Sequence, residues 1–192
     1  MKNDTKFIGI VGPSGSGKTT LVKRLTNLFE DVEHIRLDNY FKNPETFPKK
    51  KGFLNWERPE NLKFDELLTH LKSLKEGKEV HTKTFPKKKG GESRDIVLRP
   101  KPIVIIEGFM LFKNKEVREM LDTKIYLDIS ADLMLERRGI RFGKDHVSDY
   151  DTEVAIPEFL DYGVIQKEDA DFIVDASKSQ EEILKEVVKI IK

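Results

Sequence analysis

The feature that most constrains this chain is the octapeptide 12–19, which reads Gly-Pro-Ser-Gly-Ser-Gly-Lys-Thr and fits the pattern G-x-x-x-x-G-K-[ST]. It directly follows the apolar run 7–11, which predicts a strand. In such a loop, glycines let backbone N–H groups surround a polyphosphate, Lys18 reaches the β/γ oxygens, and the Thr19 hydroxyl ligates Mg²⁺. The residues expected to bind the nucleotide phosphates are Gly12, Pro13, Ser14, Gly15, Ser16, Gly17, Lys18, Thr19, Thr20 and, from farther along the chain, Arg137.

Two other phosphate-binding classes fit the sequence less well. The glycines of the loop follow G-x-x-G-x-G, whereas a dinucleotide-binding turn needs G-x-G-x-x-G. A GTPase needs D-x-x-G and N-K-x-D, but no Asp of this chain precedes a Gly by three residues, and Asn114-Lys115-Glu116-Val117 lacks the final Asp. A P-loop ATPase or a nucleotide-binding regulatory protein stays open as an alternative.

Short apolar runs recur along the chain and alternate with segments of helical period, which is typical of a parallel α/β sheet. The expected strands are 7–11, 34–37, 103–106, 124–129 and 171–174. A helix with Leu21, Leu25 and Leu28 on its core face follows the loop, and Asn61 is a candidate cap for a second helix from residue 64. Ser130 precedes a helix to Arg138, and Ser179 with Glu182 predicts a capping box for the last helix.

The composition favours one soluble enzyme domain over residues 1–192. Lys and Arg number 35 against 34 Asp and Glu, so the net charge of +1 provides no global field for a nucleic acid or an anionic membrane. Cysteine is absent, no apolar run reaches the length of a membrane span, and residues 1–4 do not resemble a signal peptide. We therefore expect a cytoplasmic protein without nucleic-acid or membrane partners, and a homo-oligomer stays open.

Two segments interrupt the alternation. Residues 39–60 form a long Lys- and Pro-rich stretch with aromatic residues of the exposed type, which favours a functional loop rather than core. Segments 79–85 and 94–99 alternate like strands around a Lys- and Gly-rich turn, which predicts a β-hairpin projecting from the sheet. The aromatic residues of the first segment are Tyr40, Phe41, Phe47, Phe53 and Trp56.

Two acids are placed where a parallel sheet binds its ligands. Asp38 ends the second predicted strand and Glu107 ends the third, so both are expected at the carboxyl edge beside the P-loop. Asp38 can accept the proton of an acceptor hydroxyl. Because Mg²⁺ uses few protein ligands, Thr19 with Asp38 and Glu107 is the candidate metal set.

A group of cations follows the fourth predicted strand. Arg137, Arg138 and Arg141 lie at the end of a predicted helix and precede a polar stretch, so residues 137–157 are expected to form a lid over the phosphates. Phosphoryl transfer needs such cations because they neutralise the negative charge on the phosphoryl group that is transferred. The candidate catalytic residues are Lys18, Asp38, Arg138 and Arg141.

Several stretches together resemble the uridine kinase family and its relatives, phosphoribulokinase and nicotinamide riboside kinase. The matching stretches are 12–21, 36–42 (Arg-Leu-Asp-Asn-Tyr-Phe-Lys), 55–60 (Asn-Trp-Glu-Arg-Pro-Glu), 64–80, 105–108 (Ile-Ile-Glu-Gly), 131–141 and 170–171. The resemblance implies a five-stranded parallel sheet with a projecting hairpin. It also implies ATP- and Mg²⁺-dependent phosphorylation of a nucleoside 5′-hydroxyl, with Asp38 as base, Glu57 on the ribose and the arginines in the lid.

The resemblance also implies where the acceptor is bound. The candidate substrate-binding residues are Asp38, Tyr40, Trp56, Glu57, Arg58, Phe85, Glu92, Glu107 and Arg137. Where uridine kinases typically have Asn-Phe-Asp-His-Pro, residues 55–59 of this chain read Asn-Trp-Glu-Arg-Pro, with a longer carboxylate and a cation in place of an imidazole. In the hairpin, Phe85 and Glu92 correspond to a Tyr and a His of such kinases. Uridine or cytidine is the expected acceptor, with nicotinamide riboside or another small hydroxylated metabolite as the alternative.

Overall fold

The expected parallel sheet is the centre of the structure, a computed structural model that describes residues 4–86, 91–142 and 148–192, without the side chains of residues 141 and 142. Five strands lie in the order β2-β7-β1-β8-β9, and each neighbouring pair is parallel. Their bounds are β1 (Lys6–Val11), β2 (Val32–Arg36), β7 (Ile103–Glu107), β8 (Thr123–Asp128) and β9 (Phe172–Asp175). All five predicted strands are thus confirmed to within a few residues.

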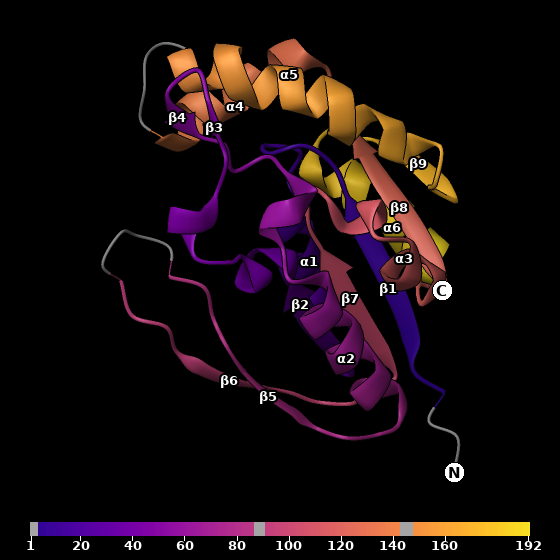
Figure 1. Cartoon of the computed structure of the whole chain (residues 1–192). Coiled ribbons are helices and arrows are strands. Elements are labelled where there is room, and N and C mark those ends of the chain that lie inside the picture. The colour runs from indigo at the N-terminus through magenta and orange to yellow at the C-terminus, as the bar shows by residue number, and fades with distance from the viewer. Residues whose placement is uncertain (1–3, 87–90, 143–147) are drawn as a thin grey trace.

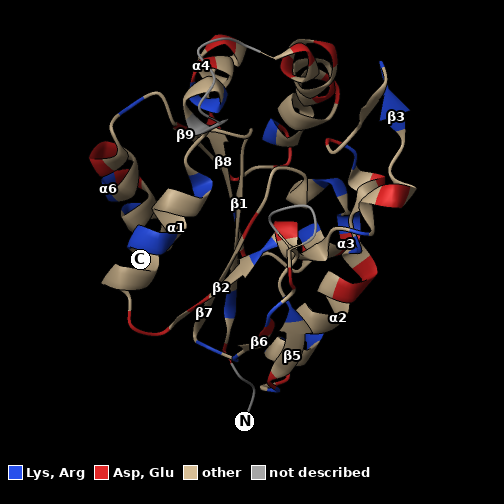
Figure 2. Ribbon diagram, turned by 90° about the vertical axis from the view of Figure 1, so that its left-hand side faces the viewer, with Lys and Arg blue, Asp and Glu red and all other residues tan. Residues whose placement is uncertain are grey.

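Helices cover both faces of this sheet. Figure 2 shows α1 (Lys18–Leu28) and α6 (Gln180–Ile191) on one side, with α2 (Phe64–Lys75) and α3 (Lys115–Glu119) on the other. Alternate β1 residues divide between two cores, because successive strand side chains point to opposite faces: Phe7 and Val11 join one cluster, Ile8 and Ile10 the other. This two-faced α/β sheet confirms the predicted fold class.

The remaining helices lie at the carboxyl ends of the strands. Helix α4 (Ala131–Phe142) follows β8, as the sequence predicts. A second helical segment, 151–167, consists of π-helical turns at Asp151–Ala155 and Phe159–Gly163, α5 (Ile156–Glu158) between them, and a 3-10 turn at Val164–Lys167. Figure 1 shows both elements at the same end of the molecule as the short ribbon of β3 (Lys49–Lys50) and β4 (Phe53–Leu54).

The predicted hairpin is also present. Strands β5 (Val80–Lys83) and β6 (Asp95–Leu98) pair antiparallel and form a two-stranded sheet separate from the main one (Figure 1). Of its turn, the Lys triplet 87–89 lies outside the described residues. Among the described residues no helix is long and apolar enough to cross a bilayer. The single domain over 1–192, its subdivisions and the cytoplasmic location stay predictions.

The helix ends are partly as expected. Ser179 and Glu182 form the predicted reciprocal capping box at α6. Asn61, in contrast, does not cap α2: the cap position is Lys63, and the buried Asn61 amide donates to the Asn55 carbonyl oxygen at 2.7 Å. Leu28 is 59% exposed because it lies in the last turn of α1, so its assignment to the core is wrong.

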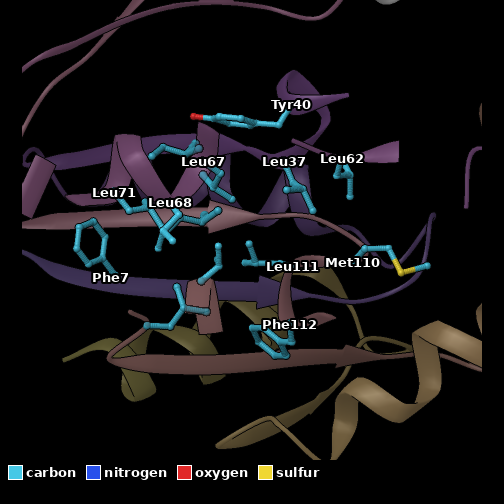
Figure 3. Packing of buried hydrophobic residues seen from close by; sticks show 14 of the residues in the cluster. Phe7, Leu37, Tyr40, Leu62, Leu67, Leu68, Leu71, Met110, Leu111 and Phe112 are labelled. Carbon is cyan, nitrogen blue, oxygen red and sulfur yellow. The ribbon is translucent and has the colours of Figure 1, made fainter. Parts of the chain in front are cut away.

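The expectation that segment 39–60 stands apart from the core is wrong for three aromatic residues. Tyr40, Phe41 and Phe47 are at least nine-tenths buried and pack in the cluster between the sheet and α2. Figure 3 shows Tyr40 in this cluster together with Leu37 and Leu67. The segment lacks regular periodicity, because its 3-10 turns and short ribbon present apolar side chains at irregular intervals. It is a packed wall of the molecule.

Gly108 explains how closely this wall approaches the sheet. A Cβ atom at Gly108, directly after β7, would lie 2.3 Å from the Leu37 Cβ, far inside van der Waals contact. Leu37 opens the 3-10 turn Leu37–Tyr40 directly after β2. The glycine therefore allows the ends of β2 and β7 to lie side by side with Asp38 and Glu107 at the same edge.

Candidate functional site

A cleft of about 1630 Å³ lies at the carboxyl edge of the sheet. Its walls are the P-loop with the start of α1, the ends of β2 and β7, the segment around Trp56, and α4 with residues 148–151. Ligands of open α/β sheets bind at this edge. It is therefore the candidate active site.

The P-loop is held in an anion-binding form by its own backbone and by Lys18. Gly15 and Gly17 both have φ of 90°, a left-handed conformation that suits glycine. The Lys18 ammonium is largely buried and donates to the carbonyl oxygens of Gly12 at 2.7 Å and Pro13 at 2.9 Å. The first N–H groups of α1 lack carbonyl partners within the helix and attract anions at this end.

Glu107 is a buried carboxylate at the floor of the cleft, 4% exposed. Its Oε1 accepts a hydrogen bond from the Thr19 hydroxyl at 2.8 Å and lies 3.4 Å from Arg36 Nε and 3.6 Å from His34 Nε2. Burial alone would raise the pKa of Glu107, but the His34 ring, the Lys18 ammonium and the Thr19 hydroxyl together lower it to about 2. The carboxylate is therefore ionised at neutral pH beside a hydroxyl ligand.

Asp38 lies two residues beyond the end of β2 and is about half exposed, with its side chain at the wall of the cleft. Arg36 Nη2 is 3.3 Å from Asp38 Oδ2, while the Nε of the same guanidinium faces Glu107. One arginine thus lies between two acids of the site. This cation limits the repulsion between the carboxylates and leaves Asp38 open to the cleft.

A third acid, Glu57, lies across the cleft in a network with residues of α4 and of the helical segment. The Tyr150 hydroxyl donates to Glu57 Oε1 at 3.3 Å, and Arg138 Nη1 lies 3.6 Å from the same oxygen. Arg138 Nε donates to Asp151 Oδ1 at 2.7 Å, so its buried guanidinium bridges two acids. Burial raises the pKa of Glu57, while Arg138 and Tyr150 oppose the rise.

Arg137, next to Arg138 on α4, contacts the other side of the cleft. Its Nη1 donates to the carbonyl oxygen of Gly15 at 3.2 Å and to that of Ala176 at 2.9 Å. The guanidinium thereby joins α4 to the P-loop and to the turn after β9. Cations from one helix therefore face both the phosphate loop and the Glu57 side of the cleft.

Aromatic side chains form the wall of the cleft beyond Asp38. The Phe41 and Trp56 rings meet edge to face with centroids 5.3 Å apart, and Phe109 lies 6.3 Å from Phe41. All three line the cleft. Such rings offer flat surfaces for stacking an aromatic ligand.

Most of the site residues predicted from sequence line this one cleft. They are Ser14, Gly15, Ser16, Gly17, Lys18, Thr19, Thr20, Asp38, Trp56, Glu57, Glu107, Arg137 and Arg138. Gly12 and Pro13 lie buried beneath it, and their carbonyls accept from Lys18. Their functional roles stay predictions, but the structure brings together the phosphate loop and three acids from distant parts of the chain.

Four predicted substrate-binding residues are not brought to the cleft. The Tyr40 ring is buried, with its hydroxyl 2.9 Å from His70 Nδ1. Arg58 points to Glu60 and stacks over the Tyr162 ring, 4.8 Å from its centroid. Phe85 lines a smaller pocket under the hairpin, and Glu92 is exposed outside both pockets. The side chain of Arg141 lies outside the described residues.

The structure adds cleft residues that the sequence interpretation missed. Arg36 and His34 alternate along β2 before Asp38, and this period of two was a signal that they share the face of the acid. Phe41 was noted only as a loop aromatic. For Tyr150 the sequence held no local signal, because its partner Glu57 is 93 residues away.

The sequence and the fold of this chain are both similar to those of known kinases. A sequence model of the phosphoribulokinase / uridine kinase family matches residues 7–182. A uridine kinase of Chlamydia pneumoniae is 35% identical over 139 residues, which are 70% of this chain and 63% of that protein. A uridine kinase of Staphylococcus epidermidis (strain ATCC 12228) is 36% identical over 148 residues, covering 74% of this chain and 71% of that protein.

For the first of these relatives, and for a uridine kinase of Borrelia turicatae with 65%, the match spans less than two thirds of their length. Among solved structures, a possible uridine kinase from Bacillus stearothermophilus has a TM-score of 0.59 at 20% identity, covering 89% of each chain. Shikimate kinase from Acinetobacter baumannii has a TM-score of 0.59 at 17% identity, covering 98% of this chain and 94% of that one. These structural likenesses concern the fold.

Proposed function

The chain belongs to the phosphoribulokinase / uridine kinase family, and we propose that it transfers the γ-phosphoryl group of ATP to the 5′-hydroxyl of a nucleoside, uridine or cytidine. The observation that carries the proposal is the shared cleft: Lys18 in the P-loop, Asp38 and Glu57 all line it. A phosphate cradle, a partly exposed carboxylate and a second acid for hydroxyl binding are the parts that a kinase acting on a sugar hydroxyl can use.

Nucleotide and Mg²⁺ fit the residues present. Thr19 and Glu107 place a hydroxyl and an ionised carboxylate 2.8 Å apart at the phosphate loop, and both are oxygen ligands of the kind that Mg²⁺ prefers. Within the described residues no group of three or more acids, histidines or cysteines gathers to hold a metal, which suits an ion held largely by phosphates and water. When bound, Mg²⁺ neutralises negative charge on the phosphates.

The chain's own residues divide the reaction between them. The Lys18 ammonium exchanges the carbonyl oxygens of Gly12 and Pro13 for phosphate oxygens when nucleotide binds. The oxygen of the acceptor hydroxyl attacks the γ-phosphorus while Asp38 accepts the proton of that hydroxyl. The bond between the γ-phosphorus and the oxygen that leaves with ADP breaks. Arg137 and Arg138 stabilise the charge that develops on the transferred group.

Glu57 is the proposed ligand of the ribose hydroxyls, because it lies opposite the P-loop and its pKa is raised by burial, so a hydroxyl donor stabilises its ionised form. Phe41, Trp56 and Phe109 supply a stacking wall for the base. Because stacking discriminates weakly between aromatic rings, nicotinamide riboside is the second candidate acceptor.

The test is ADP release from ATP and Mg²⁺ with uridine, cytidine, adenosine, nicotinamide riboside or no acceptor. We expect pyrimidine nucleosides to stimulate release, and D38N to lower kcat by about 10² or more while the KM for ATP changes less than twofold. The exposed D161N serves as the matched control. Stimulation by nicotinamide riboside alone would redirect the acceptor assignment, whereas acceptor-independent hydrolysis or full activity of D38N would contradict the proposed mechanism.

A further inference from the structure

Glu158 is a fully buried acid, 1% exposed, that does not line the cleft. It belongs to α5 in the middle of the helical segment 151–167. Its Oε1 accepts hydrogen bonds from Lys50 Nζ at 2.8 Å and from Asn55 Nδ2 at 2.9 Å. On the other oxygen, Oε2, Arg58 Nη1 lies 3.6 Å away, beyond hydrogen-bond distance.

Burying a carboxylate lowers the stability of the folded protein unless cations and hydrogen-bond donors are held in place around it. Removing an ion from water costs several kcal/mol, which only well-placed cations and hydrogen bonds offset. Here two cations and one amide converge on Glu158, and all three come from the segment 49–60 that forms the acceptor wall. The buried carboxylate therefore fixes the segment 49–60 against the helical segment 151–167. Its hydrogen bond with Asn55 joins two residues that are 103 positions apart in the sequence.

Asn55 passes this restraint on to Glu57. The Asn55 side chain is 2% exposed, and its Oδ1 accepts a hydrogen bond from the backbone N–H of Glu57 at 3.0 Å. Its backbone carbonyl accepts from the Asn61 amide at 2.7 Å. The amide of Asn55 thus binds Glu158 with its nitrogen and the backbone of Glu57 with its oxygen.

Glu57 is then held at two points by one helical region. Asn55 fixes its backbone, while the Tyr150 hydroxyl, just before the helical segment, donates to its carboxylate at 3.3 Å. Tyr150 also accepts a hydrogen bond from the Trp56 N–H at 3.3 Å. The direction of the Glu57 carboxylate consequently depends on Glu158, and the dependence runs through Asn55.

We propose that Glu158 is a positioning residue for acceptor binding, which sets the place of the Glu57 carboxylate through Asn55 and is paired with Lys50 and Arg58. The inference rests on the proposed function, in which Glu57 binds the acceptor. It also assigns Arg58 to this buried cluster instead of to the acceptor itself.

A positioning role and a merely structural role predict different kinetics. If Glu158 only stabilises the fold, its replacement lowers the melting temperature and the active fraction, and KM values stay as in the wild type. If it positions Glu57, the KM for the acceptor rises while the KM for ATP is unchanged, because the P-loop is not part of the cluster.

The experiment compares E158Q, N55A and the double variant N55A/E158Q of the full chain, with E168Q as control for an exposed carboxylate directly after the helical segment. ADP release is measured against uridine and ATP. We expect E158Q and N55A each to raise the acceptor KM about 10-fold, with the KM for ATP within twofold. The double variant should be no worse than the poorer single variant, because both act on one path. E168Q should match the wild type.

Trp56, the only tryptophan of the sequence, provides a readout independent of turnover. It lies between Asn55 and Glu57, so acrylamide quenching of its fluorescence should increase in E158Q and not in E168Q. If the wild type phosphorylates no acceptor but the quenching rises, the proposed function fails and the link between Glu158 and this segment stands. Unchanged acceptor KM and unchanged quenching in E158Q would overturn the inference, as would a lower melting temperature as its only effect.

Discussion

Replacement of Glu107 by glutamine tests the electrostatics of the cleft floor without any substrate. In the folded protein the carboxylate is 95% buried and faces Thr19 and Lys18 from α1 and His34 and Arg36 from β2. Burial opposes the ionised form, but His34, Lys18 and Thr19 together lower the pKa of Glu107 from 4.5 to about 2. Since each pKa unit is worth about 1.4 kcal/mol, the ionised carboxylate contributes about 3 kcal/mol to stability at neutral pH.

The sign of the pH dependence follows from the direction of this change. A carboxyl group whose pKa is lower in the folded than in the unfolded state stabilises the protein above the unfolded pKa, and the contribution is lost as pH falls toward the folded value. The Glu107 contribution should therefore be complete at pH 7, and it should decrease to about 1 kcal/mol at pH 3. E107Q removes it at every pH.

The assay is urea unfolding of wild type and E107Q from pH 7 to pH 3, followed by Trp56 fluorescence in EDTA so that no divalent cation binds the site. We expect the free energy of unfolding of the wild type to exceed that of E107Q by about 2 kcal/mol more at pH 7 than at pH 3. The exposed E30Q controls for the change from acid to amide. A difference between wild type and E107Q that stays constant over this range would refute the stabilisation of Glu107 by its neighbours.

Two further substitutions probe the walls of the cleft. G108A should destabilise the protein by about 1–3 kcal/mol in urea unfolding and lower kcat, because the new Cβ would meet Leu37 beside Asp38 at 2.3 Å; a variant with wild-type stability would show that the strand ends separate freely. Y150F should raise the acceptor KM about 5-fold with little change for ATP, because Glu57 loses one hydrogen-bond donor. Equal losses for both substrates would instead indicate a general disturbance of the cleft.

The sequence predicted the sheet and the phosphate site because both depend on local patterns. Runs such as 7–11 and 103–106 have the length and composition of buried strands, and the octapeptide 12–19 carries its chemistry within eight residues. The capping box at Ser179 is equally local. The strands and this cap are confirmed, because a few neighbouring residues determine them, whereas phosphate binding by residues 12–19 stays a prediction.

The acceptor side was predicted less well because its contacts are distant in sequence. Tyr40 and Phe47 were predicted to be exposed but are buried. They lie in or beside short 3-10 turns, where buried side chains do not recur at a regular spacing that the sequence would reveal. Arg58 looked like a ligand contact but faces the buried Glu158, a residue without any local motif. Asn61 resembled a helix cap but bonds to the Asn55 carbonyl oxygen instead.

The order of the strands separates the part of the chain that binds phosphate from the part that is proposed to select the acceptor. Strands β2 and β7 are neighbours, with Arg36 opposite Glu107 in the register, so residues 37–102 form a single excursion between two adjacent strands. The phosphate loop lies outside this excursion, whereas Phe41, Trp56 and Glu57 of the proposed acceptor site lie inside it and Phe109 follows it. We therefore expect that a graft of this excursion that re-specifies the acceptor must also carry the two residues that hold it from outside, Tyr150 and Glu158.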